Sequence, residues 1–236
     1  MISKARKSFL NDLAITIDSI KINHPLRVAI DGVDTSGKTT LADELAEYLK
    51  KHKRPIIRAS IDKFHRPKAD RYKRGADSPE GYYEDSFNHE LLVSSLLQPI
   101  GENKPFIKEA FDYKTDSPLV SESLTVEKNA ILLMDGVFLL RSELNPYWDL
   151  RIFLQVPFET VIERAKVRDA EYLGGEQQVE DRYFKRYIPG QKIYLDSVHP
   201  QEIAGIVIDN ADFNNPSIVR IELASKIREN LTEENI

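Results

Sequence analysis

Short apolar runs recur along the chain, and each has the length of a buried strand. They cover residues 26–30, 55–61, 130–136, 150–156 and 205–210. Segments with apolar residues at helical spacing lie between them, and further helices are expected at residues 3–20 and 216–230. Strands that alternate with helices form parallel sheets, so the pattern predicts an α/β fold in three layers, α/β/α, around a mainly parallel five-stranded sheet.

Two segments interrupt this alternation, at about residues 62–118 and 169–190. The first turns to charge, Gly, Pro and Tyr at 68–88, which is typical of a long functional loop, and resumes helical spacing at 91–97 before stopping at Pro99. Strand-like residues at 105–107 and 111–113 then indicate a hairpin outside the main sheet. The second segment has two helical stretches on either side of Gly174 and Gly175, a hinge that suits a lid. We expect one domain over residues 1–236 that carries both insertions.

The first predicted strand is followed at residues 32–39 by GVDTSGKT, a complete match to the phosphate-binding loop pattern G-x-x-x-x-G-K-[ST]. The glycines let successive backbone N–H groups point inward, and the following helix adds its partial positive charge. Lys38 is expected to reach the β- and γ-phosphate oxygens, and the Thr39 hydroxyl to bind Mg²⁺. The residues predicted to bind a nucleoside triphosphate are Gly32, Asp34, Thr35, Ser36, Gly37, Lys38, Thr39 and Thr40.

Two acids end strands near this loop. Asp135 closes the apolar run ILLMDG, and we expect it to hold Mg²⁺ together with Thr39. Asp62 follows the second strand, at the edge where open α/β sheets bind their ligands, and is predicted to act at the γ-phosphate. Alternatively, Asp62 is a helix cap or a turn acid, and Asp135 only ends a strand that is followed by a plain turn.

Basic residues mark the predicted lid. Arg164 and Arg168 lie one turn apart on one helix face, and Arg182 opens the basic and aromatic segment 182–191. Arg168 and Arg182 are predicted to neutralise charge on the transferred phosphoryl group. The alternative is a pair of solvated, charged helices.

Composition excludes several classes of protein. A net charge of −5 gives no general basic surface for nucleic acid, and no apolar run approaches the length of a membrane span. The absence of cysteine excludes disulfides and thiolate zinc sites, and the five histidines are scattered. The N-terminus lacks the apolar core of a signal peptide, so a cytoplasmic location is expected. Whether the chain forms a homo-oligomer stays open.

With GVDTSGKT, SIDKFHRP, ILLMDG, RAKVRD and VIDN in this order, the chain resembles the uridine kinase and phosphoribulokinase group of P-loop kinases over roughly residues 25–210. The resemblance implies ATP and Mg²⁺ as cofactors and a small-molecule hydroxyl acceptor, with the first insertion binding the acceptor. It also implies that Asp62 accepts the proton of the attacking hydroxyl, while Lys38, Arg168 and Arg182 act on the phosphates. The aromatic and histidine side chains predicted to contact the acceptor are Phe64, His65, Tyr83, Phe111 and Tyr113, and the aromatic rings among them suit a core position equally well.

The chain departs from this group in its acceptor and lid motifs. Residues 81–88 read GYYEDSFN where uridine kinases carry N-F-D-H-P, and Asp116 and Pro118 replace the histidine and arginine of Y-D-F-x-x-H-x-R. Residues 173–176 read LGGE in place of R-G-R-D. The sequence therefore predicts ATP-dependent phosphoryl transfer to a nucleoside-like or sugar-like hydroxyl. The alternatives are a nucleotide-binding switch without a small acceptor, although no N-K-x-D segment is present, and a kinase-like protein that has lost catalysis.

Overall fold

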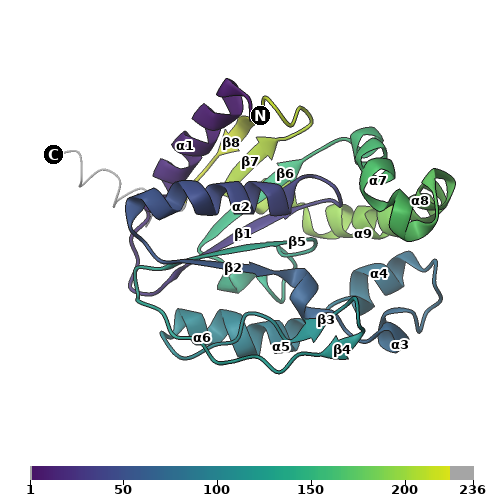
Figure 1. Ribbon diagram of the computed structural model, residues 1–236, viewed down its shortest axis with the longest axis horizontal. Coiled ribbons are helices and arrows are strands. Elements are labelled where there is room, and N and C mark those ends of the chain that lie inside the picture. The colour runs from purple at the N-terminus through teal and green to yellow at the C-terminus, as the bar shows by residue number, and fades with distance from the viewer. Residues whose placement is uncertain (1, 224–236) are drawn as a thin grey trace.

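A computed structural model of the protein describes residues 2–223, and a six-stranded sheet runs through its centre (Figure 1). The strand order is β2-β5-β1-β6-β7-β8, with β8 antiparallel to β7 and the other pairs parallel. The strands are β1 Leu26–Gly32, β2 Ile56–Ser60, β5 Ile131–Gly136, β6 Leu150–Gln155, β7 Ile206–Asp209 and β8 Ser217–Ile221. The five predicted strands form the parallel part of this sheet.

The sixth strand corrects the prediction for the end of the chain. Residues 217–221 were expected to be helical, but they form β8, which pairs with β7 at the edge of the sheet. The β-branched residues Ile218, Val219 and Ile221 favour this conformation once an unpaired strand edge is available. The rest of the predicted helix, from residue 224 on, lies outside the described residues.

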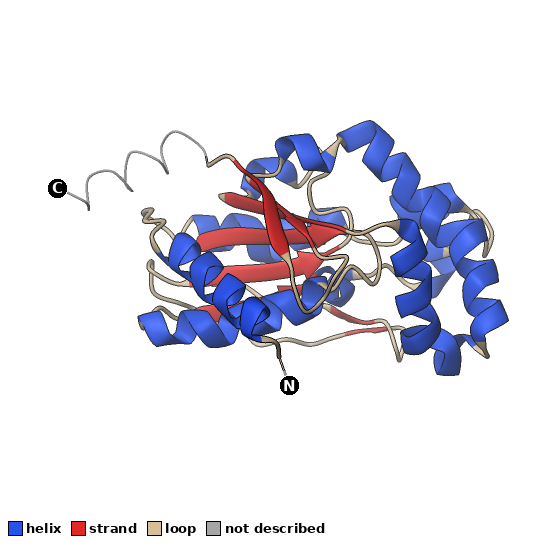
Figure 2. Ribbon diagram, turned by 90° about the horizontal axis from the view of Figure 1, so that it is seen from above, coloured by secondary structure: helices blue, strands red, loops and turns tan. Residues whose placement is uncertain are grey.

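Helices cover both faces of the sheet, as the views in Figures 1 and 2 show together. On one face lie α1 Lys4–Asp18 and α2 Lys38–Leu49, which pack against each other. In β1, Val28 and Ile30 belong to the core on this side, whereas Ala29 belongs to the core on the other side. The alternation of side chains along a strand thus divides the interior into two apolar layers, and the predicted three-layer α/β/α fold is confirmed.

The first insertion, on the opposite face, is more helical than predicted. The expected loop 68–88 contains α3 Lys68–Arg71 and α4 Pro79–Asp85, after the short 3₁₀ turn Ile61–Phe64. The Ser78 hydroxyl caps α4 by accepting a hydrogen bond from Gly81 N at 2.9 Å, with Pro79 in the first helical turn, so local capping overrides a loop-like composition.

The helix predicted after this stretch continues beyond Pro99. It runs through α5 His89–Leu92, a π-helical turn Val93–Leu97 and α6 Gln98–Gly101. A hairpin outside the main sheet is present, but its first strand is not 105–107 as predicted: β3 Phe111–Asp112 pairs with β4 Ser117–Pro118, while Phe106 forms an isolated bridge with Leu124.

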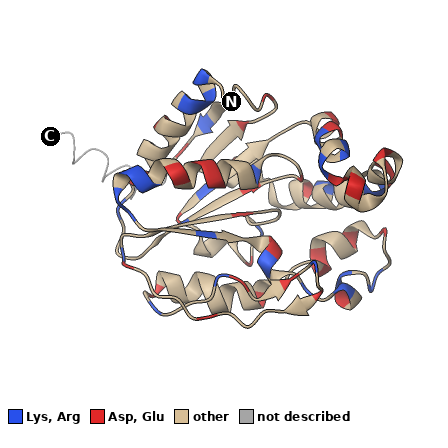
Figure 3. Cartoon of the chain, viewed as in Figure 1, with Lys and Arg blue, Asp and Glu red and all other residues tan. Residues whose placement is uncertain are grey.

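The predicted lid region starts in α7 Phe158–Leu173 and continues through α8 Glu176–Arg182, the π-helical turn Tyr183–Tyr187 and α9 Ile188–Val198. Gly174 and Gly175 separate α7 from α8 with φ values of 94° and 128°, which L residues rarely adopt. Acidic and basic residues are interspersed on α7 and α8 (Figure 3), and Lys166 joins these helices by an ion pair with Glu180 at 2.7 Å.

Three short elements complete the described chain. They are the 3₁₀ turns Lys50–His52 and Asn145–Tyr147 and the helix α10 Pro200–Ile203. Among residues 2–223, no helix has both the length and the apolarity needed to cross a membrane.

Candidate active site

The loop between β1 and α2 depends on close contacts at its two glycines. A Cβ on Gly32 would lie 2.8 Å from the carbonyl oxygen of Leu154, and one on Gly37 would lie 2.7 Å from Asn210 Nδ2. Gly37 also has a φ of 93°. Both positions therefore require glycine, because any side chain would push neighbouring strands or the Asn210 amide away from the loop.

Two arginines hold the back of this loop. Asn210 Nδ2 donates to Ser36 O at 2.6 Å, and the buried Arg6 donates to Asn210 Oδ1 at 3.3 Å. Arg164 donates to the backbone oxygens of Thr35 and Asn210 at 3.3 and 2.8 Å. Arg164 thus supports the loop from behind and does not line the cavity described next.

A cavity of about 720 Å³ opens at the carboxyl ends of β1, β2 and β5, between the first insertion and the lid. Its sheet side is lined by Lys38, Thr39, Asp62 and Asp135, and its lid side includes Arg168. The structure thus brings together the lysine, both predicted acids and one of the two predicted lid arginines, all from elements distant in sequence.

Thr39 and Asp135 form the part of the cavity that suits a cation. Thr39 Oγ1 donates to Asp135 Oδ2 at 2.6 Å, and Arg58 Nη2 donates to Asp135 Oδ1 at 2.8 Å. A hydroxyl and a carboxylate are oxygen ligands of the kind that Mg²⁺ binds, and Mg²⁺ commonly takes one or two protein ligands beside phosphates and water. The described residues include no cluster of three or more His, Cys, Asp or Glu side chains that could hold a metal without a nucleotide.

Lys38 is the first residue of α2, and its side chain lines the cavity. Its Nζ donates to Val33 O at 2.7 Å, and its side chain is largely buried. Burial lowers the pKa of Lys38, while the negative charges of Asp34, Asp31 and Asp135 oppose this shift. Its other partner is the Ser36 hydroxyl at 3.5 Å, and a lysine held only by these two neutral oxygens inside a cavity can exchange them for phosphate oxygens.

Asp62 lies in the 3₁₀ turn after β2, and its side chain is 56% exposed towards the cavity. The cap of this turn is Ser60, whose hydroxyl accepts from Asp62 N at 3.4 Å, so the Asp62 carboxylate is not used as a cap. Reduced hydration in the cavity raises the pKa of Asp62, and the charges of Asp135 and Asp34 add to the increase, against the effect of His65.

His65 borders Asp62 on the acceptor side. Its Nδ1 lies 2.9 Å from the carbonyl oxygen of Asp62, and its ring packs against Phe87 and Tyr113 with centroid distances of 4.6 and 5.3 Å. Burial lowers the pKa of His65, which favours the neutral ring. Of the five side chains predicted to contact the acceptor, His65 and Tyr113 line the cavity.

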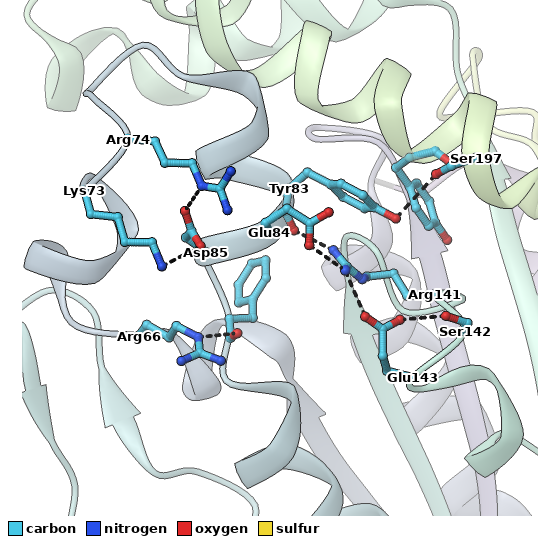
Figure 4. Close-up of polar contacts among 12 residues, drawn as sticks. Arg66, Lys73, Arg74, Tyr83, Glu84, Asp85, Arg141, Ser142, Glu143 and Ser197 are labelled. Atoms are coloured by element: carbon cyan, nitrogen blue, oxygen red, sulfur yellow. Dashed lines mark hydrogen bonds and ion pairs between the residues drawn. The ribbon is translucent and has the colours of Figure 1, made fainter.

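The other three, Phe64, Tyr83 and Phe111, are buried and do not line it. Figure 4 shows the surroundings of Tyr83, whose hydroxyl lies 3.4 Å from Ser197 Oγ and whose carbonyl accepts from Arg141 at 2.7 Å. The Arg141 guanidinium lies over the Tyr83 ring at 4.0 Å and also bonds Glu84. Tyr83 and Arg141 therefore fasten α4 to the segment after β5.

The two predicted lid arginines lie in different places. Arg168 lines the cavity, bonded to Asp169 at 2.6 Å and to the Tyr183 hydroxyl at 3.1 Å. Arg182 donates instead to the backbone oxygen of Ala76 at 2.5 Å and does not line the cavity. It joins the lid to the loop before α4.

Several side chains around the phosphate loop were not predicted as site residues, and of these Tyr82 lines the cavity. Tyr82 and Gln191 both donate to the carboxylate of Asp34, at 2.8 and 2.9 Å. Behind the loop, the fully buried Asp31 accepts a hydrogen bond from the Tyr194 hydroxyl, and burial raises the pKa of Asp31 to about 6. Nothing in the sequence around Gln191 or Tyr194 marks them, because their role depends on where α9 packs.

We compared the chain with known proteins. No family model matches it. A uridine kinase from Ligilactobacillus salivarius is 28% identical over 193 residues, covering 76% of this chain and 86% of that protein. A uridine kinase from Clostridium novyi is 27% identical over 214 residues, covering 89% and 98%.

The fold was compared in the same way. The structure of a possible uridine kinase from Bacillus stearothermophilus superposes with a TM-score of 0.70 at 24% identity, covering 86% of this chain and 98% of that one. The predicted resemblance to uridine kinases and the predicted P-loop kinase fold are both confirmed.

Proposed function

We propose that this protein is an ATP-dependent kinase that transfers the γ-phosphoryl group to a hydroxyl of a small nucleoside-like or sugar-like molecule. The observation that carries the proposal is the shared cavity. The phosphate-loop lysine, the Thr39–Asp135 pair and the open carboxylate of Asp62 meet there, and the same cavity extends to His65 and Tyr113 of the first insertion. A nucleotide switch does not require this second compartment.

The nucleotide end of the cavity performs placement and charge neutralisation. Lys38 exchanges its bond to the Val33 carbonyl for the β- and γ-phosphate oxygens of ATP, while the backbone N–H groups of the loop hold the same oxygens. Thr39 and Asp135 would hold a Mg²⁺ ion that comes with the nucleotide, and the ion would supply further neutralisation of the phosphate charge.

Asp62 is the base in this proposal. Its carboxylate is open to the cavity, next to the position of the γ-phosphate, and accepts the proton of the attacking hydroxyl. A raised pKa makes the carboxylate a stronger proton acceptor at neutral pH, because its pKa lies closer to the working pH.

Arg168 acts from the lid side. Asp169 and Tyr183 fix its guanidinium at the cavity wall, where its charge favours the oxygens of the transferred group over the ground-state phosphates. Arg182 has a positioning role in this arrangement, because it holds the lid to the first insertion without reaching the cavity.

The names of the relatives support a nucleoside acceptor, but one contact differs here. Asp116 occupies the position of the histidine in the uridine kinase motif and forms an ion pair with Arg71 at 3.0 Å, and Arg71 lines the cavity. The histidine of that motif is thereby replaced by a carboxylate held in an ion pair. We therefore keep both nucleosides and sugars in the acceptor class.

The proposal is tested by ATP consumption with nucleosides, sugars, sugar phosphates and pantothenate-like alcohols, with Lys38→Ala as the control. One acceptor should accelerate ADP formation, and mass spectrometry should find that acceptor 80 Da heavier, as a phosphoryl group requires. ATP consumption that responds to a protein partner and to no small molecule would support the switch and contradict the kinase.

A further inference from the structure

Asp34 joins three segments at the wall of the cavity. It is a variable position of the phosphate loop, and its Oδ2 accepts hydrogen bonds from Tyr82 of α4 at 2.8 Å and from Gln191 of α9 at 2.9 Å. Gln191 Oε1 also accepts from the backbone N–H of Asp34 at 2.9 Å. The side chain is thus fixed by the first insertion on one side and by the lid region on the other.

The second oxygen of this carboxylate is unused. Within residues 2–223, no protein donor bonds Asp34 Oδ1, although the residue lines the cavity. A carboxylate held in one orientation with one free oxygen is an acceptor site for a ligand that donates a hydrogen bond.

The charge of Asp34 helps to keep Lys38 protonated, but it makes no favourable direct contact with a nucleotide phosphate. Asp62 and Asp135 already line the same cavity, and a third carboxylate adds repulsion against a polyphosphate. The residue therefore fits a different ligand of the same reaction, one that brings hydroxyl groups rather than negative charge.

We propose that Asp34 is a specificity-determining residue, whose Oδ1 accepts a hydrogen bond from a second hydroxyl of the acceptor, distinct from the hydroxyl that is phosphorylated. Asp34 thereby selects polyols such as riboses and sugars over simple alcohols. Tyr82 and Gln191 are positioning residues that hold Oδ2. This inference rests on the proposed kinase function, which supplies the acceptor.

The variant Asp34→Asn isolates the free oxygen. An Asn oxygen can still accept from Tyr82 and Gln191, while its amide replaces Oδ1 with a donor. Uridine, 2′-deoxyuridine, 3′-deoxyuridine, D-ribose and 2-deoxy-D-ribose are titrated by calorimetry into protein saturated with Mg²⁺ and AMP-PNP. In the wild type, loss of the recognised hydroxyl should weaken binding about tenfold, as expected for a charge-assisted hydrogen bond. In Asp34→Asn the preference for polyols over their deoxy analogues should shrink, because a neutral amide donor to the hydroxyl oxygen replaces the charged acceptor.

Two controls accompany this measurement. Asp12→Asn removes an equal charge from an exposed site on α1 and should bind every probe as the wild type does. Tyr82→Phe removes one of the two donors to Oδ2 and should weaken polyol binding by a smaller factor. It provides a second test if Asp34→Asn does not fold. The affinity for Mg²⁺ and AMP-PNP alone should be unchanged or higher in Asp34→Asn.

Three results would overturn the inference. They are equal affinity of the wild type and Asp34→Asn for polyols, a loss of affinity in Asp34→Asn that affects AMP-PNP alone, and no binding of polyols by the wild type. A parallel ATP-consumption assay separates the two proposals. Hydroxyl-dependent binding without turnover would contradict the kinase function and leave the role of Asp34 in place.

Discussion

Asp31 offers a quantitative test of the electrostatics behind the phosphate loop. Its side chain is fully buried, and its pKa rises from an ordinary 3.8 to about 6, because burial outweighs the hydrogen bonds from Tyr194 and from the backbone. Each pKa unit corresponds to about 1.4 kcal/mol. Keeping this carboxylate charged in the folded protein therefore costs about 3 kcal/mol above pH 6.

Proton linkage gives the direction in which folding stability changes with pH. Between about pH 4 and pH 6 the folded state binds more protons at Asp31 than the unfolded state does. The stability that the protonated Asp31 contributes to the fold therefore falls as the pH rises. It is fully present below pH 4 and lost above pH 6. Asp31→Asn removes the titration, although the new amide adds a constant cost where it meets backbone donors.

The assay is urea unfolding, followed by the fluorescence of Trp148, the single tryptophan, which is buried. From pH 4.5 to 7.5, the difference in unfolding free energy between the wild type and Asp31→Asn should change by about 2 kcal/mol in favour of the variant. Asp12→Asn, at an exposed position, serves as the control. A difference that stays constant with pH would refute the account of Asp31 as a buried, charged carboxylate.

Three further predictions concern the cavity. Lys38→Ala should abolish phosphoryl transfer without changing the free energy of unfolding in urea by more than about 1 kcal/mol, and turnover at the wild-type rate would contradict the assignment of the loop. Asp62→Asn should lower the plateau rate about 10²–10⁴-fold with the Mg²⁺ requirement unchanged. Asp135→Asn should instead raise the Mg²⁺ concentration that gives half of the maximal rate. The measurement is a Mg²⁺ titration at saturating ATP, and the reverse pattern would exchange the roles of the two acids. Arg168→Ala should reduce kcat by a larger factor than it raises the KM for ATP. Arg182→Ala, at a residue outside the cavity, should reduce kcat less than Arg168→Ala does. Equal losses of kcat in the two variants would place both arginines at the phosphates.

The sequence predicts best what depends on local pattern. The strands, the phosphate loop and the position of Asp62 and Asp135 follow from runs of apolar residues with fixed neighbours, because parallel strands all end at one edge. The direction of single aromatic side chains does not follow. Phe64 and His65 are adjacent in sequence, yet Phe64 is buried while His65 faces the cavity, and this choice depends on how the first insertion packs.

Hydrogen bonds between residues far apart in the sequence cannot be predicted from local patterns, for another physical reason. Gln191 reaches Asp34 across 157 positions of the chain, and its residue type is common on helix surfaces. Only the packing of α9 against the loop gives it a partner. The strand β8 likewise depends on the free edge of β7, which overrides an apolar spacing that also fits a helix.

The bond between Arg6 and Asn210 has a consequence for synthesis of the protein. These residues are 204 positions apart, and Asn210 holds the backbone of Ser36 in the phosphate loop. A nascent chain on the ribosome contains the whole loop long before Asn210 is made. The loop thus lacks the support of Asn210 until the chain has been made beyond β7, and ATP should help only chains that include residue 210 to fold.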